Sequence, residues 1–170
     1  MVTTNGFPKS GSHALVKAVQ LLGIPCEVDH IKFGDKVNQK HILIKRDPRN
    51  IICSWVRFIG NPVTDGMFIT AFRKFQAENF CSEINEYRGW LEDENTLVVK
   101  YENLIADDKE IRKIADYLQT PYLDSAFKNL FGDTRTWCET HSDFNLIWTD
   151  EVEKIWQAEG GAKIQFDWGY

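Results

Sequence analysis

The 170-residue chain has only four cysteines, no Cys-x-x-Cys pair, and no apolar run of the roughly twenty residues that a membrane helix needs. The dispersed cysteines predict reduced thiols in a core, and we expect neither disulfides nor a metal site. No signal peptide precedes the first expected strand, so we expect a cytoplasmic protein without a membrane span. A net charge of −5 argues against nucleic acid as a partner.

The residues that are present suit a compact fold. The chain is 43% hydrophobic and 13% aromatic, enough for one sizeable core, so we expect a single domain over residues 1–170. Short β-prone runs alternate with helical patterns, which favours an α/β fold in three layers, with a central parallel sheet flanked by helices. We expect strands at residues 2–4, 26–30, 41–45 and 96–101, and helices over residues 14–22, 48–59, 67–80, 111–118 and 149–160.

A loop rich in small residues separates the first expected strand from the first helix. Residues 6–13 read Gly-Phe-Pro-Lys-Ser-Gly-Ser-His, and the start of the helix offers unpaired N–H groups and the positive end of the helix dipole. Lys9 adds a cation, and Ser10 and Ser12 add hydroxyl donors. These features predict a P-loop-like phosphate-binding loop. It lacks the Gly-Lys-Ser/Thr order of nucleotide triphosphatases because Lys9 precedes Gly11, and the alternative is a plain turn with a solvated lysine.

A second polar segment follows a buried strand. Asp47 is a natural N-cap and Pro48 suits the first helical position, so Arg46 ends the strand. Residues at strand ends in open α/β sheets line the ligand crevice. Ser54 lies two turns into the following helix. The alternatives are a surface ion pair for Arg46 and a surface hydroxyl for Ser54.

Three segments in this order resemble the sulfotransferases that use 3′-phosphoadenosine 5′-phosphosulfate (PAPS). They are the loop Pro-Lys-Ser-Gly-Ser at residues 8–12, Arg46 followed eight residues later by Ser54, and Val-Val-Lys-Tyr-Glu-Asn-Leu at residues 98–104. Weaker similarity extends through Trp90 to the final Gly169-Tyr170. The resemblance implies transfer of a sulfuryl group from PAPS to a hydroxyl or amine, with adenosine 3′,5′-bisphosphate as product.

The resemblance also implies a set of nucleotide-binding residues. The loop would hold the 5′-phosphosulfate, Arg46 and Ser54 would hold the 3′-phosphate, and Tyr101 would lie near the adenine unless it is a core tyrosine. Arg135 is the substitute for a family Arg-Lys-Gly motif that this chain lacks. The candidate residues are Lys9, Ser10, Gly11, Ser12, His13, Arg46, Ser54, Tyr101 and Arg135.

Two residues are candidates for the chemical step, which we expect to be an in-line transfer. Lys9 would stabilise charge on the departing phosphate oxygen. His30 occupies the place where the family has its histidine base, and imidazole suits proton transfer near neutral pH. Asp29 and Glu27 remain alternative bases.

The chain departs from the family pattern at two of these places. Cytosolic members have Thr-Thr-Trp after Lys-Ser-Gly, whereas Ser12, His13 and Ala14 stand here, so the aromatic that would stack on adenine is missing. The Lys-Thr-His of the family becomes Val28, Asp29 and His30. The stacking partner of the adenine is therefore not identified by the sequence.

The sequence leaves the acceptor and two other function classes open. A small hydroxylated metabolite, a lipid or a sugar would suit equally, and several aromatic residues could line an apolar cavity or fill the core. A P-loop nucleotide kinase would need Gly-Lys-Ser/Thr and a magnesium-binding Asp, for which Asp47 is a poor candidate. An inactive module that binds PAPS or its product is the other alternative. The aromatic residues in question are Phe33, Trp55, Phe58, Phe68 and Phe72.

Overall fold

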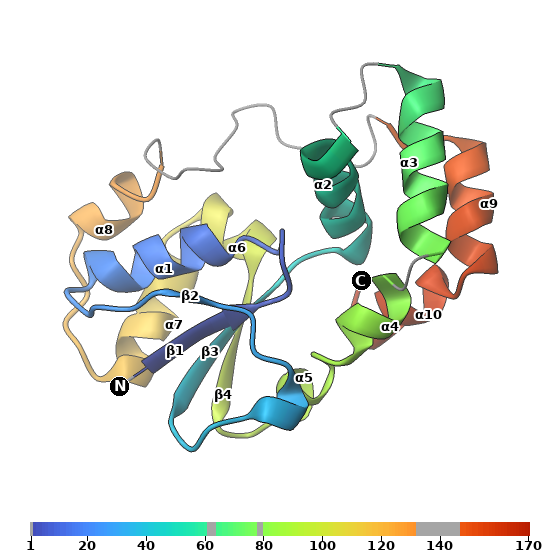
Figure 1. Cartoon of the computed structure of the whole chain (residues 1–170). Coiled ribbons are helices and arrows are strands. Elements are labelled where there is room, and N and C mark those ends of the chain that lie inside the picture. The colour runs from blue at the N-terminus through green and yellow to red at the C-terminus, as the bar shows by residue number, and fades with distance from the viewer. Residues whose placement is uncertain (1, 61–63, 78–79, 132–146) are drawn as a thin grey trace.

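A four-stranded parallel sheet forms the centre of the protein (Figure 1). The structure is a computed structural model that describes residues 2–60, 64–77, 80–131 and 147–170. The strands β1 (Val2–Gly6), β2 (Val28–Asp29), β3 (Lys40–Lys45) and β4 (Thr96–Lys100) lie in the order β2-β1-β3-β4. All three strand pairs are parallel, with Thr4 opposite Ile42 and Leu43 opposite Val98. The predicted α/β fold with a central parallel sheet is confirmed.

Helices flank the sheet on both faces. The helices are α1 (Ser12–Leu21), α2 (Pro48–Gly60), α3 (Asp65–Ala77), α4 (Phe80–Asn85), α5 (Gly89–Glu92), α6 (Tyr101–Ala106), α7 (Lys109–Leu118), α8 (Ser125–Lys128), α9 (Asp150–Ala158) and α10 (Gly161–Asp167), with a short 3₁₀ turn at Phe33–Asp35. Two helices begin where capping residues were predicted. Before α2 the Asp47 carboxylate accepts a hydrogen bond from the Arg49 N–H at 2.9 Å, and before α9 the Thr149 hydroxyl accepts one from the Val152 N–H at 3.3 Å.

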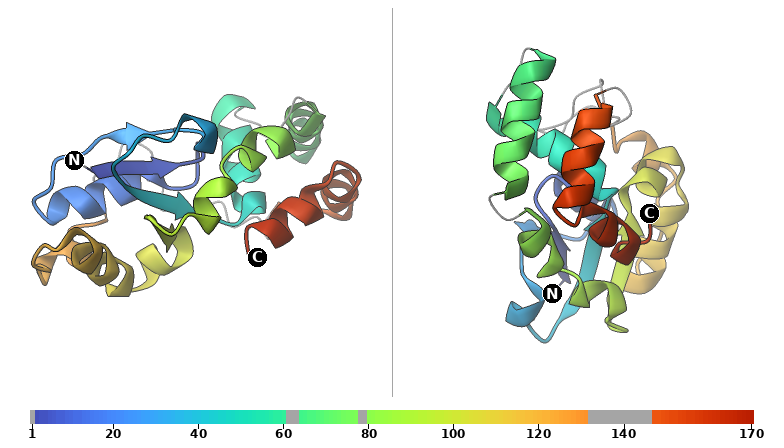
Figure 2. Two further views of the ribbon diagram at one scale, coloured as in Figure 1. Left: turned by 90° about the horizontal axis from the view of Figure 1, so that it is seen from below. Right: turned by 90° about the vertical axis from the view of Figure 1, so that its right-hand side faces the viewer.

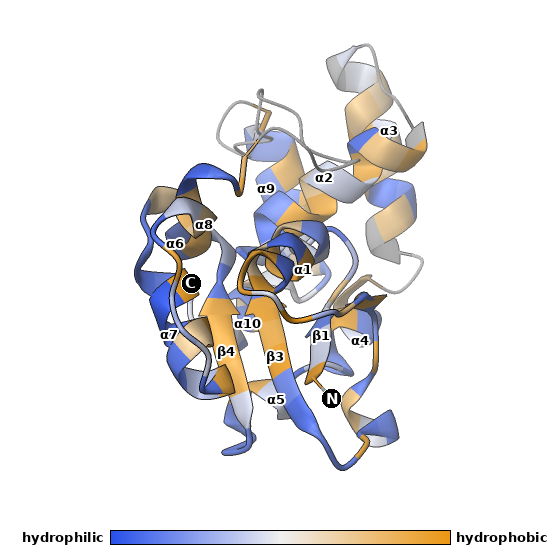
Figure 3. Ribbon diagram, turned by 90° about the vertical axis from the view of Figure 1, so that its left-hand side faces the viewer, coloured by the Kyte–Doolittle hydropathy of each residue, from blue (hydrophilic) through white to orange (hydrophobic). Residues whose placement is uncertain are grey.

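The alternation of side chains along β3 divides the core into two layers. Ile42 and Ile44 pack with apolar residues of α1, α6, α7 and α8, whereas Leu43 packs with those of α2 to α5, α9 and α10. Two further views separate these helix layers (Figure 2), and the hydropathy colouring shows an apolar stretch in both β3 and β4 (Figure 3). Strands covered on both faces are apolar throughout, which is why the run Ile-Leu-Ile at residues 42–44 predicted a buried strand.

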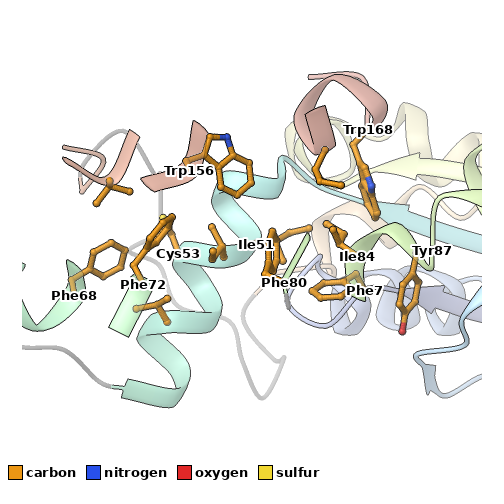
Figure 4. Packing of buried hydrophobic residues seen from close by; sticks show 14 of the residues in the cluster. Phe7, Ile51, Cys53, Phe68, Phe72, Phe80, Ile84, Tyr87, Trp156 and Trp168 are labelled. Atoms are coloured by element: carbon orange, nitrogen blue, oxygen red, sulfur yellow. The ribbon is translucent and has the colours of Figure 1, made fainter. Parts of the chain in front are cut away.

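The second layer is rich in aromatic rings (Figure 4). Phe7, the first residue after β1, packs edge-on against Phe80 and Tyr87, with ring centroids 5.6 and 5.4 Å apart. Phe68 and Phe72, which the sequence left open as cavity or core residues, are buried in this layer. The aromatic layer therefore anchors the loop that follows β1.

The end of the chain and one strand boundary can be compared with the sequence-based expectation. The helix expected to end at Gly160 does end there, since α9 stops at Ala158 and Gly160 has a positive φ of 83°, but a further helix that was not expected, α10, begins at Gly161. A Cβ on Gly161 would lie 2.1 Å from the Trp156 ring, so close packing, rather than termination, explains that glycine. Tyr101, expected at a strand end, is the first residue of α6. Within the described ranges, no helix combines the length and apolarity needed to cross a bilayer.

Asn5 ties the end of β1 to the segment that follows β2. Its side chain is fully buried, and its amide oxygen accepts hydrogen bonds from the N–H groups of Gly6 (2.8 Å) and Ile31 (2.9 Å). Its amide nitrogen donates to the Ile31 carbonyl at 2.9 Å. Because β2 has only two residues, these side-chain bonds extend the connection between the two strands beyond the backbone ladder.

We therefore expect Asn5→Ala to lower the free energy of unfolding by about 2–4 kcal/mol, because buried donors and an acceptor lose their partners. Urea unfolding measures the change. Asn95→Ala, at an exposed turn position, is the matched control and should change stability by less than about 0.5 kcal/mol. Equal stability of the two variants would contradict the role assigned to Asn5.

Candidate functional site

The order of the strands marks the place where a ligand crevice is expected. The chain leaves β1 for β2 on one side and then crosses to β3 on the other, so the direction of winding reverses between β1 and β3. Ligands of open α/β folds bind outside the carboxyl ends of the strands at such a point. Residues 7–11 follow β1 there, and Arg46 follows β3.

The loop after β1 is held in a conformation that depends on glycine. The Ser10 N–H donates to the Phe7 carbonyl at 3.0 Å, and Lys9 has a positive φ of 71°, which non-glycine residues rarely adopt. Gly11 has a φ of 105°, and a Cβ there would lie 2.3 Å from the Tyr101 ring. The loop thus passes directly over Tyr101, and only glycine fits at the contact.

The loop holds two buried hydroxyls without a partner. Ser10 Oγ and Ser12 Oγ are inaccessible to solvent, and neither makes a hydrogen bond in the described part of the chain. Buried polar groups are normally paired, so unpaired ones at the start of α1 are donors available to a ligand. The Lys9 ammonium lies 3.2 Å from the ring centroid of Phe58, which is 67% exposed at the end of α2.

Arg46 connects the two strand ends. Its side chain is 7% exposed, its Nη1 donates to the Lys9 carbonyl at 3.3 Å, and its guanidinium carbon lies 4.5 Å from the centre of the Tyr101 ring. Arg46 Nε has no hydrogen-bond partner among the described residues. The Tyr101 ring is therefore packed between Gly11 and Arg46 and supports both residues.

The remaining nucleotide-binding candidates are less closely joined to this group. Ser54 is half-buried in the second turn of α2, and His13 is exposed in the first turn of α1. The neighbouring Cys53 is a thiol, because burial raises its pKa to about 12. Arg135 lies outside the residues that the structure describes.

His30 is adjacent to the loop, although it comes from another strand connection. Its Nδ1 is 2.6 Å from the Gly6 carbonyl oxygen, which can only accept, so Nδ1 carries a proton and Nε2 is the nitrogen left for proton transfer. The His30 carbonyl accepts a hydrogen bond from the Tyr87 hydroxyl at 2.8 Å, and burial raises the pKa of Tyr87 to about 12. Tyr87 therefore remains a donor that fixes the His30 backbone.

The alternative bases face elsewhere. Asp29 and Glu27 line a cavity together with Val2 and Thr3, which lie at the amino-terminal end of β1. His30, by contrast, contacts Gly6 at the carboxyl end of β1.

The described residues contain no cluster of three or more His, Cys, Asp or Glu side chains with metal-binding geometry. Asp47, the carboxylate that a kinase would need for magnesium, is bonded instead to Arg49, whose Nη2 donates to Asp47 Oδ2 at 2.8 Å. Three of the four cysteines, Cys26, Cys53 and Cys81, are described, and none of them is in a disulfide.

Comparison with known proteins identifies the family. The sequence model of the sulfotransferase domain matches residues 34–136, more than half of the chain. The chain belongs to the sulfotransferase family. It is thus an enzyme of the sulfotransferase class, and the nucleotide kinase alternative is set aside. The matched segment includes Arg46, Ser54 and Tyr101, whereas Lys9 and His30 precede it.

The fold of this sulfotransferase is also that of a solved relative. It is similar to mouse sulfotransferase SULT7A1 complexed with PAP, with a TM-score of 0.72 and 14% sequence identity, over 96% of this chain and 83% of that one. No curated protein matches the sequence. At this identity the likeness bears on the fold alone, and the roles of individual residues rest on the contacts described above.

Proposed function

We propose that this sulfotransferase transfers a sulfuryl group from PAPS to a hydroxyl or amine of a small-molecule acceptor. The observation that carries the proposal is the set of buried donors without partners at the carboxyl ends of β1 and β3: Ser10 Oγ, Ser12 Oγ and Arg46 Nε. Unpaired buried donors lower stability unless a ligand pairs with them. They come from two segments, as a nucleotide with two separate phosphate groups requires.

The chemistry of these donors fits such a nucleotide. The N–H groups and hydroxyls at the start of α1 suit the 5′-phosphosulfate. The Arg46 guanidinium, with Ser54, suits the 3′-phosphate, because a planar guanidinium donates paired, charge-assisted hydrogen bonds. Packing on Tyr101 and the bond to the Lys9 carbonyl hold the guanidinium in place. Arg135 stays a further candidate for the same phosphate.

When bound, PAPS supplies the sulfuryl group and a phosphate that can leave. Lys9 would stabilise negative charge on that phosphate oxygen. Its ammonium makes a cation–π contact with Phe58, worth about 0.5–2 kcal/mol, and the flexible side chain would leave this ring to reach the phosphate. Phe58 would then be exposed beside the reacting group, where an apolar part of an acceptor could pack.

His30 is the base that we favour. Its Nδ1 contact with the Gly6 carbonyl supports a tautomer whose Nε2 accepts a proton, and that contact ties the ring to the residue next to the loop. The cavity lined by Asp29 and Glu27 counts against those carboxylates. The alternative of an inactive module that binds the nucleotide is distinguished by turnover with labelled PAPS and a panel of hydroxylated metabolites, lipids and sugars.

We expect adenosine 3′,5′-bisphosphate to raise the melting temperature of the protein much more than adenosine 5′-phosphate does, because only the former engages Arg46 and Ser54. A thermal-shift titration of both nucleotides, with and without magnesium, measures the difference. Equal shifts, or a strict requirement for magnesium, would contradict PAPS as the donor.

We expect Arg46→Ala to weaken binding of adenosine 3′,5′-bisphosphate by about 2–4 kcal/mol, because the 3′-phosphate loses its charged partner. Ser54→Ala should cost about 1 kcal/mol, the loss of one hydroxyl contact. Isothermal titration calorimetry measures both. Arg112→Ala on α7, which removes a surface ion pair with Asp108 just before that helix, is the control and should leave affinity unchanged. Unchanged affinity in Arg46→Ala would remove this residue from the nucleotide site.

We expect His30→Ala to cut turnover by about a hundredfold or more while nucleotide affinity stays nearly intact, and Lys9→Ala to reduce both. Turnover is measured with an acceptor from the panel, and nucleotide affinity by calorimetry. Full activity in His30→Ala would move the base to Asp29 or Glu27.

A further inference from the structure

The last three residues lie against the carboxyl ends of β3 and β4. Lys45, the last residue of β3, donates from Nζ to the Trp168 carbonyl at 2.7 Å, and Lys100, the last residue of β4, donates to the Gly169 carbonyl at 3.5 Å. The Trp168 side chain is buried among the aromatic residues that Figure 4 shows. Residues 168–170 are therefore fixed to the edge of the sheet that also bears Arg46.

Tyr170 makes the most specific contact of this segment. Its hydroxyl donates to Glu102 Oε2 at 2.7 Å, and the ammonium groups of Lys100 and Lys45 lie 4.9 and 5.5 Å from its ring centre. Burial and the charge of Glu102 raise the pKa of Tyr170, so its hydroxyl stays a donor at neutral pH. One oxygen of the Glu102 carboxylate is thereby held.

The other oxygen of the carboxylate reaches the segment that carries Arg46. Glu102 Oε1 accepts a hydrogen bond from the Asp47 N–H at 3.1 Å, where β3 ends and α2 begins. The guanidinium of Arg46 packs on Tyr101, the residue before Glu102. Residues 46–47 thus contact residues 101–102 twice, once through the guanidinium and once through the backbone.

We propose that Tyr170 is a positioning residue for Arg46 and thereby sets the affinity for the 3′-phosphate of the nucleotide. The inference rests on the proposed function, in which Arg46 binds that phosphate. By holding one oxygen of Glu102, the Tyr170 hydroxyl keeps the other directed at the Asp47 N–H.

The test is the Tyr170→Phe variant, which keeps the ring and removes only the hydroxyl. We expect its Kd for adenosine 3′,5′-bisphosphate to rise about fivefold, the loss of roughly one hydrogen bond, while its Kd for adenosine 5′-phosphate is unchanged. A general structural defect would weaken both nucleotides. The difference between the two ligands therefore isolates an effect that acts through Arg46.

Tyr117→Phe is a matched control. Tyr117 is likewise half-buried, its hydroxyl donates to the Asn95 carbonyl at 2.7 Å, and the Lys40 ammonium lies 5.1 Å from its ring centre, but Lys40 is at the opposite end of the sheet. We expect no change in either Kd. Glu102→Gln, a second variant that keeps the side-chain shape and removes the charge, should reduce the preference for the bisphosphate as Tyr170→Phe does.

Different results separate this inference from the function on which it rests. In an Arg46→Ala background, Tyr170→Phe should have no further effect on bisphosphate affinity, because the residue through which it acts is absent. Equal weakening of both nucleotides, or an unchanged preference in Tyr170→Phe and Glu102→Gln, would overturn the role of Tyr170 and leave the proposed function standing. A wild type that binds both nucleotides equally would overturn the proposed function itself.

Discussion

The hydrogen bond from Arg46 to the Lys9 carbonyl, made over the ring of Tyr101, is the contact on which the arrangement of the site depends. It joins the segments after β1 and β3 at the point where the winding of the sheet reverses. Gly11 must lack a side chain because Tyr101 lies directly below it. Three segments far apart in sequence, which contribute Lys9 and Gly11, Arg46, and Tyr101, thus form one unit, in which a change at any member would displace the others.

The parts around this unit explain how a strained and polar loop is maintained. Phe7 anchors the loop in the aromatic layer, and Asn5 ties β1 to the chain just after His30. Because these contacts hold the loop in place, it keeps a positive φ at Lys9 and two buried hydroxyls without partners among the described residues. Backbone strain and unpaired buried groups lower stability locally, and both are typical of binding sites, where rigid surroundings hold groups ready for a ligand.

Much of this organisation could be predicted from short segments of sequence. The loop of residues 6–13 and the strand end at Arg46 have strong local signals, glycine and serine before a helix and an N-cap with proline after an apolar run. The aromatic residues were harder to assign. Phe68 and Phe72 belong to the core whereas Phe58 is exposed beside Lys9, and helical spacing alone cannot distinguish them because both positions lie on apolar helix faces.

The sequence by itself determined the parallel α/β architecture and the two strand ends that carry Lys9 and Arg46, because strand periodicity, capping and loop composition act over a few residues. Only the tertiary structure decided that Tyr101 supports Arg46, that His30 bonds to Gly6, and that Tyr170 reaches Glu102. These contacts join residues from 24 to 68 positions apart in the chain. Their geometry follows from the order and register of the strands, which no local pattern encodes.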